Sequence, residues 1–292
     1  MTHQIEPGAT PELEMVRGLG KTSRRGRYTL IRVTDPGSRA SPLQKKQIME
    51  MIERESLAMM AGVDIRASYW RRRPDYVDRL SEWSIAEQGG HIVAWCGVCA
   101  WQAPMGRVLY VDTLGVMPGH RRSGLGALLV FEAWCRSWGG KGSFPAISLR
   151  TQSPVVYAML HRFVPDITYP QLTSPDVKPP PRAVDAATYT VDQTSPGKAF
   201  DPVTGIVRKA LDYAGSLYGH DLPQTGNPCI DEFFERRMDV RDGDSMIAVV
   251  LWNRRSVMRA AFAYALVWSQ LARRLSRCQV KVRRPDEKVA GI

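Results

Sequence analysis

Residues 121–126, Arg-Arg-Ser-Gly-Leu-Gly, have the composition of an anion-binding loop. A strand-like apolar segment that ends at Val116 precedes them, and the spacing of apolar residues predicts a helix over 124–138. The first N–H groups of a helix have no partner within it and form the positive end of its dipole. The two glycines let a ligand approach the backbone, and the two arginines add positive charge. The segment therefore predicts a site for a phosphate or a pyrophosphate.

The order of these residues makes the motif specific. Residues 121–126 fit the pattern R/Q-x-x-G-x-G/A, and Leu114-Gly-Val116-x-Pro118 comes directly before them. The first segment resembles the acyl-CoA loop of the GNAT N-acetyltransferase superfamily, and the second resembles the strand that leads into that loop. The resemblance covers about residues 28–170. It implies an α/β (α+β) fold with a mixed, mostly antiparallel central sheet flanked by helices. The fourth and fifth strands would splay apart, and a C-terminal extension would follow.

The resemblance also implies acetyl-CoA as cosubstrate and indicates where it binds. In that family the pantetheine arm enters the gap between the splayed strands and pairs with the main chain of the fourth strand. The loop amides hold the pyrophosphate, and an amide of the same strand polarises the thioester carbonyl. The expected CoA-binding residues are Leu114, Gly115, Val116, Arg121, Arg122, Ser123, Gly124, Leu125, Gly126 and Ser153.

Tyr157 is the candidate general acid. Ser153 is a favoured N-cap, followed by Pro at the first helical position, so a helix is predicted to begin there. The resemblance implies that a tyrosine one turn into this helix protonates the departing CoA thiolate. The family often has Gly-Phe three residues further on, where this chain has His161 and Arg162, so the end of the helix differs. The alternative is a tyrosine packed in the core.

Asp112 is the candidate base. Strict alternation along an extended strand would place Val108, Tyr110, Asp112, Leu114 and Val116 on one face. A carboxylate on an apolar face is costly unless it has a partner. The resemblance implies that an acidic residue here takes the proton of the amine, often through water. The alternative is a structural aspartate bonded to neighbouring backbone or to an arginine.

The expected activity is the transfer of an acetyl group from acetyl-CoA to an amine acceptor, by direct attack in a ternary complex. No metal is expected, because the sequence contains no recognisable cluster of metal ligands. The alternative is a GNAT-like module that binds acyl-CoA without turnover, as a sensor or an interaction domain. No motif identifies the acceptor, whether a small amine, a peptide or a protein.

The composition is that of a soluble globular protein, with 44% hydrophobic and 24% charged residues in 292. The net charge of +11 is concentrated in residues 253–292, which hold ten basic and two acidic residues. Their apolar stripe predicts a helix that packs on the catalytic domain or on a second subunit, or else lies on an anionic membrane. Nucleic acid is not an expected partner. Five cysteines and an N-terminus without a signal peptide predict a cytoplasmic protein. If the C-terminal helix lies on an anionic membrane, the protein would be peripheral to that membrane.

The sequence divides into four parts. They are a flexible N-terminal arm over 1–27, a catalytic domain over 28–170, a Pro-rich segment and substrate-side extension over 171–252, and a basic amphipathic helix and tail over 253–292. Within them, strands are expected at 28–33, 83–87, 91–102, 107–116, 146–151 and 246–252. Helices are expected at 42–60, 66–83, 124–138, 153–163 and 253–277, the second of them interrupted near Pro74.

Overall fold

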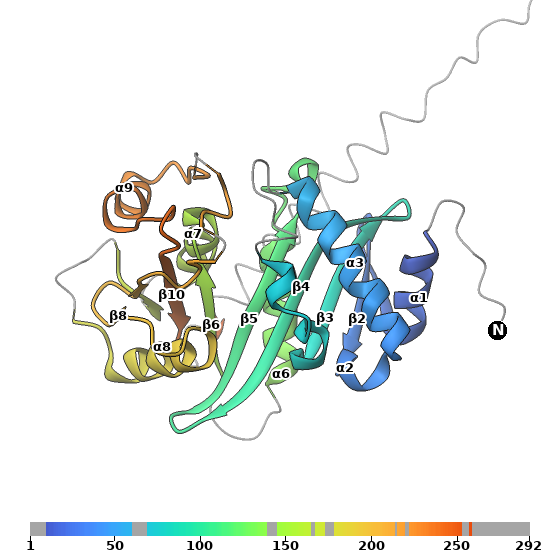
Figure 1. Ribbon diagram of the computed structural model, residues 1–292, viewed down its shortest axis with the longest axis horizontal. Coiled ribbons are helices and arrows are strands. Elements are labelled where there is room, and N and C mark those ends of the chain that lie inside the picture. The colour runs from blue at the N-terminus through green and yellow to red at the C-terminus, as the bar shows by residue number, and fades with distance from the viewer. Residues whose placement is uncertain are drawn as a thin grey trace, which may run out of the picture.

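The computed structural model describes residues 10–59, 69–138, 145–164, 167–172, 178–213, 215–219, 222–252 and 257–258. They contain a ten-stranded sheet in the order β1-β2-β3-β4-β5-β6-β10-β9-β8, with β7 paired to β10 (Figure 1). Neighbouring strands are antiparallel except for β5 and β6. The strands are β1 (Lys21–Arg25), β2 (Tyr28–Thr34), β3 (Glu82–Gln88), β4 (His91–Ala103), β5 (Gly106–Val116), β6 (Ala146–Thr151), β7 (Thr168–Tyr169), β8 (Phe200–Asp201), β9 (Ile206–Val207) and β10 (Ser245–Val250).

Helices cover both faces of this sheet, which confirms the expected mixed fold. α6 packs on β3, β4 and β5 from one face, where α7 also contacts β6. α3 contacts β5, and α8 contacts β6 and β10, from the other face. The helices are α1 (Pro11–Leu19), α2 (Pro36–Arg39), α3 (Pro42–Met59), η1 (Trp70–Arg72), α5 (Tyr76–Arg79), η2 (Pro118–His120), α6 (Leu125–Ser137), α7 (Pro154–Phe163), α8 (Pro181–Thr194) and α9 (Pro228–Arg237).

The described part of the N-terminal segment forms helix and strand, so the flexible arm expected over residues 1–27 is wrong for this part. α1 buries Leu13 and Val16, and β1 pairs with β2 at the edge of the sheet. Arg17 forms an ion pair with the buried carboxylate of Glu87 in β3 at 2.5 Å. The segment folds because it contacts residues that are distant in the sequence. Its mixed local composition does not reveal these contacts and so predicts no structure.

Two further expectations can be compared with the structure. The helix expected over residues 66–83, with an interruption near Pro74, forms in the described part of that range as the short η1 and α5, which are separated at residues 73–75. The chain then enters β3 at Glu82, so the expected helix ends too late. The extension over residues 171–252 carries α8, β8, β9, α9 and β10, and β10 lengthens the sheet beyond β6. Apart from residues 257–258, the helix expected over residues 253–277 lies outside the described residues.

Among the helices that the structure describes, every one is too short or too polar to cross a lipid bilayer.

Leu13→Ala tests whether α1 belongs to the folded body. The Leu13 side chain is 1% exposed, so its truncation leaves a cavity, and we expect the free energy of unfolding to fall by about 2–5 kcal/mol. The matched control is Leu43→Ala in α3, where the side chain is 66% exposed and the expected change is below about 0.5 kcal/mol. Urea denaturation followed by tryptophan fluorescence measures both. Equal, small changes in the two variants would mean that α1 is not part of the core.

Candidate functional site

The two central strands of the sheet separate in the middle. β5 and β6 pair in parallel from Val108↔Ala146 to Val111↔Leu149. Beyond that point β5 continues alongside β4, and β6 continues alongside β10. A wedge therefore opens between residues 112–116 of β5 and the end of β6, which confirms the expected splay of these two strands.

A β-bulge lies where the wedge begins. Asp112 falls between the pairs Gly97↔Thr113 and Val98↔Val111 and has no partner residue in β4. A bulge adds one residue to a strand and so reverses the alternation of side chains beyond it. A bulge next to a wedge also leaves main-chain groups of β5 available to a ligand.

The bulge corrects one sequence-based expectation, that alternate residues from Val108 to Val116 share a face. Tyr110 packs in the core on the α3 side. Leu114 and Val116 instead pack toward α6, where a methyl group on Gly126 would stand 3.6 Å from Leu114 Cδ2 and 3.4 Å from Val116 Cγ2. The expectation was wrong because a one-residue insertion in the pairing leaves no mark in the sequence pattern.

The Asp112 carboxylate is held by arginines. Arg73 Nη2 donates to both carboxylate oxygens, at 2.5 and 2.6 Å, and Arg79 Nη2 lies 3.8 Å away. The side chains of Asp112 and Arg73 are only 4% and 9% exposed. Burial lowers the pKa of Arg73, but the Tyr69 phenol and the Asp112 carboxylate outweigh this, so that pKa lies well above its ordinary value. This position fits the structural alternative for Asp112, and its role as a base stays a prediction.

The loop between β5 and α6 has the predicted geometry at its glycine. Gly124 adopts φ +83°, a left-handed conformation that favours glycine, directly before α6 begins. The first hydrogen bond of the helix runs from Leu128 N–H to the Gly124 carbonyl, at 2.9 Å. The amides before Leu128 therefore have no partner within the helix. Leu125 N–H donates to Ser123 Oγ at 3.3 Å, and Gly126 lies close to Leu114 and Val116 of β5, where the sequence predicts an anion site.

Arg121 has a structural role in this loop. Its Nε donates to the Val116 carbonyl at 3.3 Å and its Nη2 to the Met59 carbonyl at 3.0 Å. The guanidinium therefore joins the end of α3 to the end of β5, while Arg122 is exposed and has φ +59°. Binding of CoA by Leu114, Gly115, Val116, Arg121, Arg122, Ser123, Gly124, Leu125, Gly126 and Ser153 stays a prediction.

α7 begins as the sequence predicts, but it buries its tyrosine. Ser153 precedes the helix, and its amide donates to Thr151 Oγ1 at 2.8 Å. The Tyr157 side chain is fully buried, its hydroxyl donates to the Pro170 carbonyl at 2.5 Å, and burial raises its pKa to about 12. This placement fits the alternative of a core tyrosine, and the role as general acid stays a prediction.

Gln152 attaches the C-terminal extension to the end of β6. The side chain is buried, and its Nε2 donates to the carbonyls of Gly215 at 3.1 Å and Asp244 at 3.0 Å. Its Oε1 accepts from Leu217 N–H at 2.9 Å. One side chain therefore positions the segment that contains Tyr213 beside the wedge.

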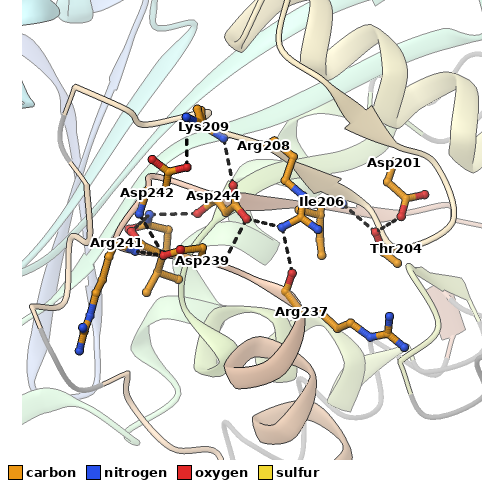
Figure 2. Close-up of polar contacts among 12 residues, drawn as sticks. Asp201, Thr204, Ile206, Arg208, Lys209, Arg237, Asp239, Arg241, Asp242 and Asp244 are labelled. Atoms are coloured by element: carbon orange, nitrogen blue, oxygen red, sulfur yellow. Dashed lines mark hydrogen bonds and ion pairs between the residues drawn. The ribbon is translucent and has the colours of Figure 1, made fainter.

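A buried carboxylate, that of Asp244, also holds this segment in place. Figure 2 shows Asp244 at the centre of this network: it accepts from Arg208 Nη1 at 2.5 Å and from the amides of Lys209 and Asp239, each at 3.0 Å. A methyl group on Gly243 would come within 2.6 Å of Leu211 O, so the turn and the segment are closely packed. The extension is therefore fixed against the end of β6.

Several of these residues were not found by sequence reasoning. Arg73, Gln152 and Asp244 each contact segments more than thirty residues away. The one available signal was the run of arginines 71–73 beside two aromatic residues. Among the residues that the structure describes, no group of His, Cys, Asp or Glu is arranged to hold a metal ion.

Asp112→Asn tests the structural role of the Arg73 pair. Removing one charge from a buried ion pair leaves the other without compensation, so we expect the free energy of unfolding to fall by about 3–5 kcal/mol. The control is Asp75→Asn, because that carboxylate is 58% exposed and its pair with Arg79 should contribute less than about 1 kcal/mol. Urea denaturation measures both variants. The same small loss in each would show that the buried pair adds little to stability.

Solved structures of several acetyltransferases are similar to parts of this chain. IAA acetyltransferase from Bacillus cereus is 14% identical over 76% of this chain and 99% of its own, with a TM-score of 0.36. Arabidopsis thaliana Naa50, in complex with the bisubstrate analogue CoA-Ac-MVNAL, is 20% identical over 28% of this chain, with a TM-score of 0.24. The present chain spans 55% of the Naa50 chain. Escherichia coli YhbS in complex with CoA is 15% identical over 47% of this chain and 69% of its own, with a TM-score of 0.31.

No curated protein matches the sequence. The family model described as "Acetyltransferase (GNAT) family" matches residues 48–158. That segment runs from α3 through the wedge strands and the loop before α6 into the first turns of α7. Residues 48–158 of this chain therefore form a domain of the GNAT acetyltransferase family.

Proposed function

We propose that this chain transfers the acetyl group of acetyl-CoA to an amine acceptor. The observation that carries the proposal is the wedge between β5 and β6, which opens at a bulge and lies beside the first turn of α6. The wedge can receive an extended amide-containing chain, and the helix terminus can receive a phosphate. Acetyl-CoA carries both groups in one molecule.

The residues around the wedge fit this cosubstrate. Main-chain groups of residues 112–116 that face the wedge are no longer paired with β6, so they are available to the amides of a pantetheine arm. The left-handed Gly124 and the small Gly126 keep the start of α6 clear of side chains. The loop amides and the exposed Arg122 supply positive charge for a pyrophosphate.

The proposed reaction is a direct displacement. The lone pair of the neutral amine forms a bond to the thioester carbonyl carbon, the C–S bond breaks, and CoA leaves as the thiolate. A main-chain amide near the bulge stabilises the negative charge that develops on the carbonyl oxygen. Holding both reactants in one wedge supplies much of the rate enhancement.

Proton transfer needs little from the side chains. The amine gives up one proton, and Asp112 can receive it through water while it remains paired with Arg73. A thiol of pKa about 8.5, the value for cysteine, yields a thiolate that is a good leaving group and takes its proton from solvent. The reaction therefore does not depend on Tyr157 as an acid.

The second candidate function is binding of acyl-CoA without turnover. It is favoured by the hydroxyl of Tyr157, which is bonded to Pro170, and by the carboxylate of Asp112, which is bonded to Arg73. A screen of amines with acetyl-CoA, following release of the CoA thiol, separates the two functions. Amine-dependent thiol release supports transfer, whereas CoA binding with no release for any amine supports the binding module.

Gly124→Asp tests the phosphate site. The new carboxylate stands where the pyrophosphate is proposed to bind. Repulsion between these two negative groups costs a few kcal/mol of binding free energy, so we expect CoA affinity to fall at least about 100-fold. Aspartate is one of the non-glycine residues that most often adopt positive φ, which limits the strain at φ +83°. Gly197→Asp is the control, because Gly197 also has positive φ, at +74°, but lies beyond α8 in open space. Calorimetry with CoA measures both, and unchanged affinity in a folded Gly124→Asp protein would refute the site.

Tyr157→Phe tests the role of the buried hydroxyl. Loss of its bond to Pro170 leaves that carbonyl without the donor, so we expect the free energy of unfolding to fall by about 1–3 kcal/mol while kcat per folded molecule stays unchanged. Denaturation and thiol-release assays on the same preparation provide both values. A fall in kcat of about 100-fold or more with unchanged CoA affinity would instead establish Tyr157 as the general acid.

A further inference from the structure

Arg150 lies at the point where the wedge begins, on the strand opposite Asp112. Val111↔Leu149 is the last pair of β5 and β6, so Asp112 and Arg150 are the next residues on the two strands. Ser148 pairs with Tyr110, and its hydroxyl contacts Thr190 of α8, so the side chain of Arg150, two residues further on, projects from the same face. Arg150 Nη1 accordingly reaches the end of α8.

The hydrogen bonds of Arg150 go only to neutral groups. Nη1 donates to the Thr194 carbonyl at 2.9 Å and to Ser195 Oγ at 2.7 Å. In the described ranges of the chain, no carboxylate pairs with Arg150, and its Nε and Nη2 make no hydrogen bond. The groups that face it electrostatically are the phenols of Tyr110, Tyr69 and Tyr213 and the guanidinium of Arg73. A largely buried cation without an anion is costly, which favours an anionic ligand.

The neighbouring charges leave this cation without compensation. The Asp112 carboxylate is already bonded to Arg73 through both oxygens and lies 3.8 Å from Arg79. Around the start of the wedge, in the part of the chain that the structure describes, the one buried carboxylate therefore lies with Arg73 and Arg79, and the other partner of Arg79, Asp75, is exposed. A second buried carboxylate, brought by a ligand, would offset part of this charge.

Tyr69 and Tyr213 lie near Arg150 on this face of the sheet. The rings of Tyr69 and Tyr213 lie 6.5 Å apart, and Arg72 stacks over Tyr213 at 5.2 Å. Tyr213 is on the segment that Gln152 and Asp244 hold against the end of β6. Tyr213 is therefore fixed in place, on the face of the sheet opposite α6.

We propose that Arg150 binds a carboxylate of the acceptor, so that the acceptor is a small molecule with both an amine and a carboxylate, such as an amino acid. This proposal rests on the proposed acetyl transfer. The free edge of the guanidinium can bind a carboxylate with two hydrogen bonds. The amine of the same molecule then lies across the wedge, near Asp112 and the bulge in β5.

The experiment compares each amino acid with the amine that lacks its carboxylate. Suitable pairs are phenylalanine and phenethylamine, lysine and 1,5-diaminopentane, and 2,4-diaminobutyrate and 1,3-diaminopropane. We expect the wild type to favour the carboxylate-bearing member of at least one pair by about 10–100-fold in kcat/KM. Arg150→Gln should bring that ratio to within about threefold of one, with CoA affinity unchanged. Ser195→Ala, which removes a partner of Arg150 but keeps its charge, should preserve the ratio.

Other results would overturn the proposal. A wild type that uses both members of every pair equally, or an Arg150→Gln protein that loses both activities in parallel, assigns Arg150 to the support of α8. If none of the amines causes thiol release, the proposed transfer is refuted instead. Calorimetry of the same amino acids and their N-acetyl derivatives on CoA-loaded protein then tests the carboxylate site by itself. Binding that Arg150→Gln abolishes supports the site, and no binding to the wild type refutes it.

Discussion

The arrangement of the site depends on the point at which β5 and β6 stop pairing with each other. A buried main-chain group without a partner is costly, so two strands can separate in the middle of a sheet only if each keeps a partner on its outer side. β5 keeps β4 to Val116, and β6 keeps β10 to Thr151. The inner sides beyond Val111 and Leu149 are left for a ligand.

The two sides of this wedge are held by different parts of the chain. On the β5 side, Arg121 joins the strand to the end of α3, and a methyl group on Gly115 would come within 2.7 Å of Met59 Cε and 2.8 Å of Trp95 Cζ2. On the β6 side, Gln152 and Asp244 hold the C-terminal extension. The extension, which lies outside residues 48–158, is thus what shapes the side of the wedge opposite β5.

Local patterns predicted the parts of the fold that depend on local interactions. The apolar runs of β4 and β5, the glycine before α6 and the Ser153-Pro154 start of α7 can each be recognised within a few residues. The bulge at Asp112 could not be predicted, because it depends on the pairing with Gly97 and Val98. The bond from Tyr157 to Pro170 and the burial of α1 are also tertiary contacts, and they override what the local composition indicates.

The excess of arginine at the wedge bears directly on how an amine could react there. An alkylamine is mostly protonated at neutral pH, and the ammonium form cannot attack a carbonyl. Positive charges nearby lower the pKa of a bound amine, because they disfavour its charged form. Arg73, Arg79 and Arg150 together outweigh the buried Asp112, because Asp75, the other partner of Arg79, is exposed and screened by solvent. An amine at the start of the wedge would therefore be shifted toward its neutral form. The same charges favour a carboxylate on the acceptor, and binding that carboxylate at Arg150 would cancel only part of the field. An enzyme built this way needs only a weak base, which is compatible with an aspartate that remains paired with Arg73.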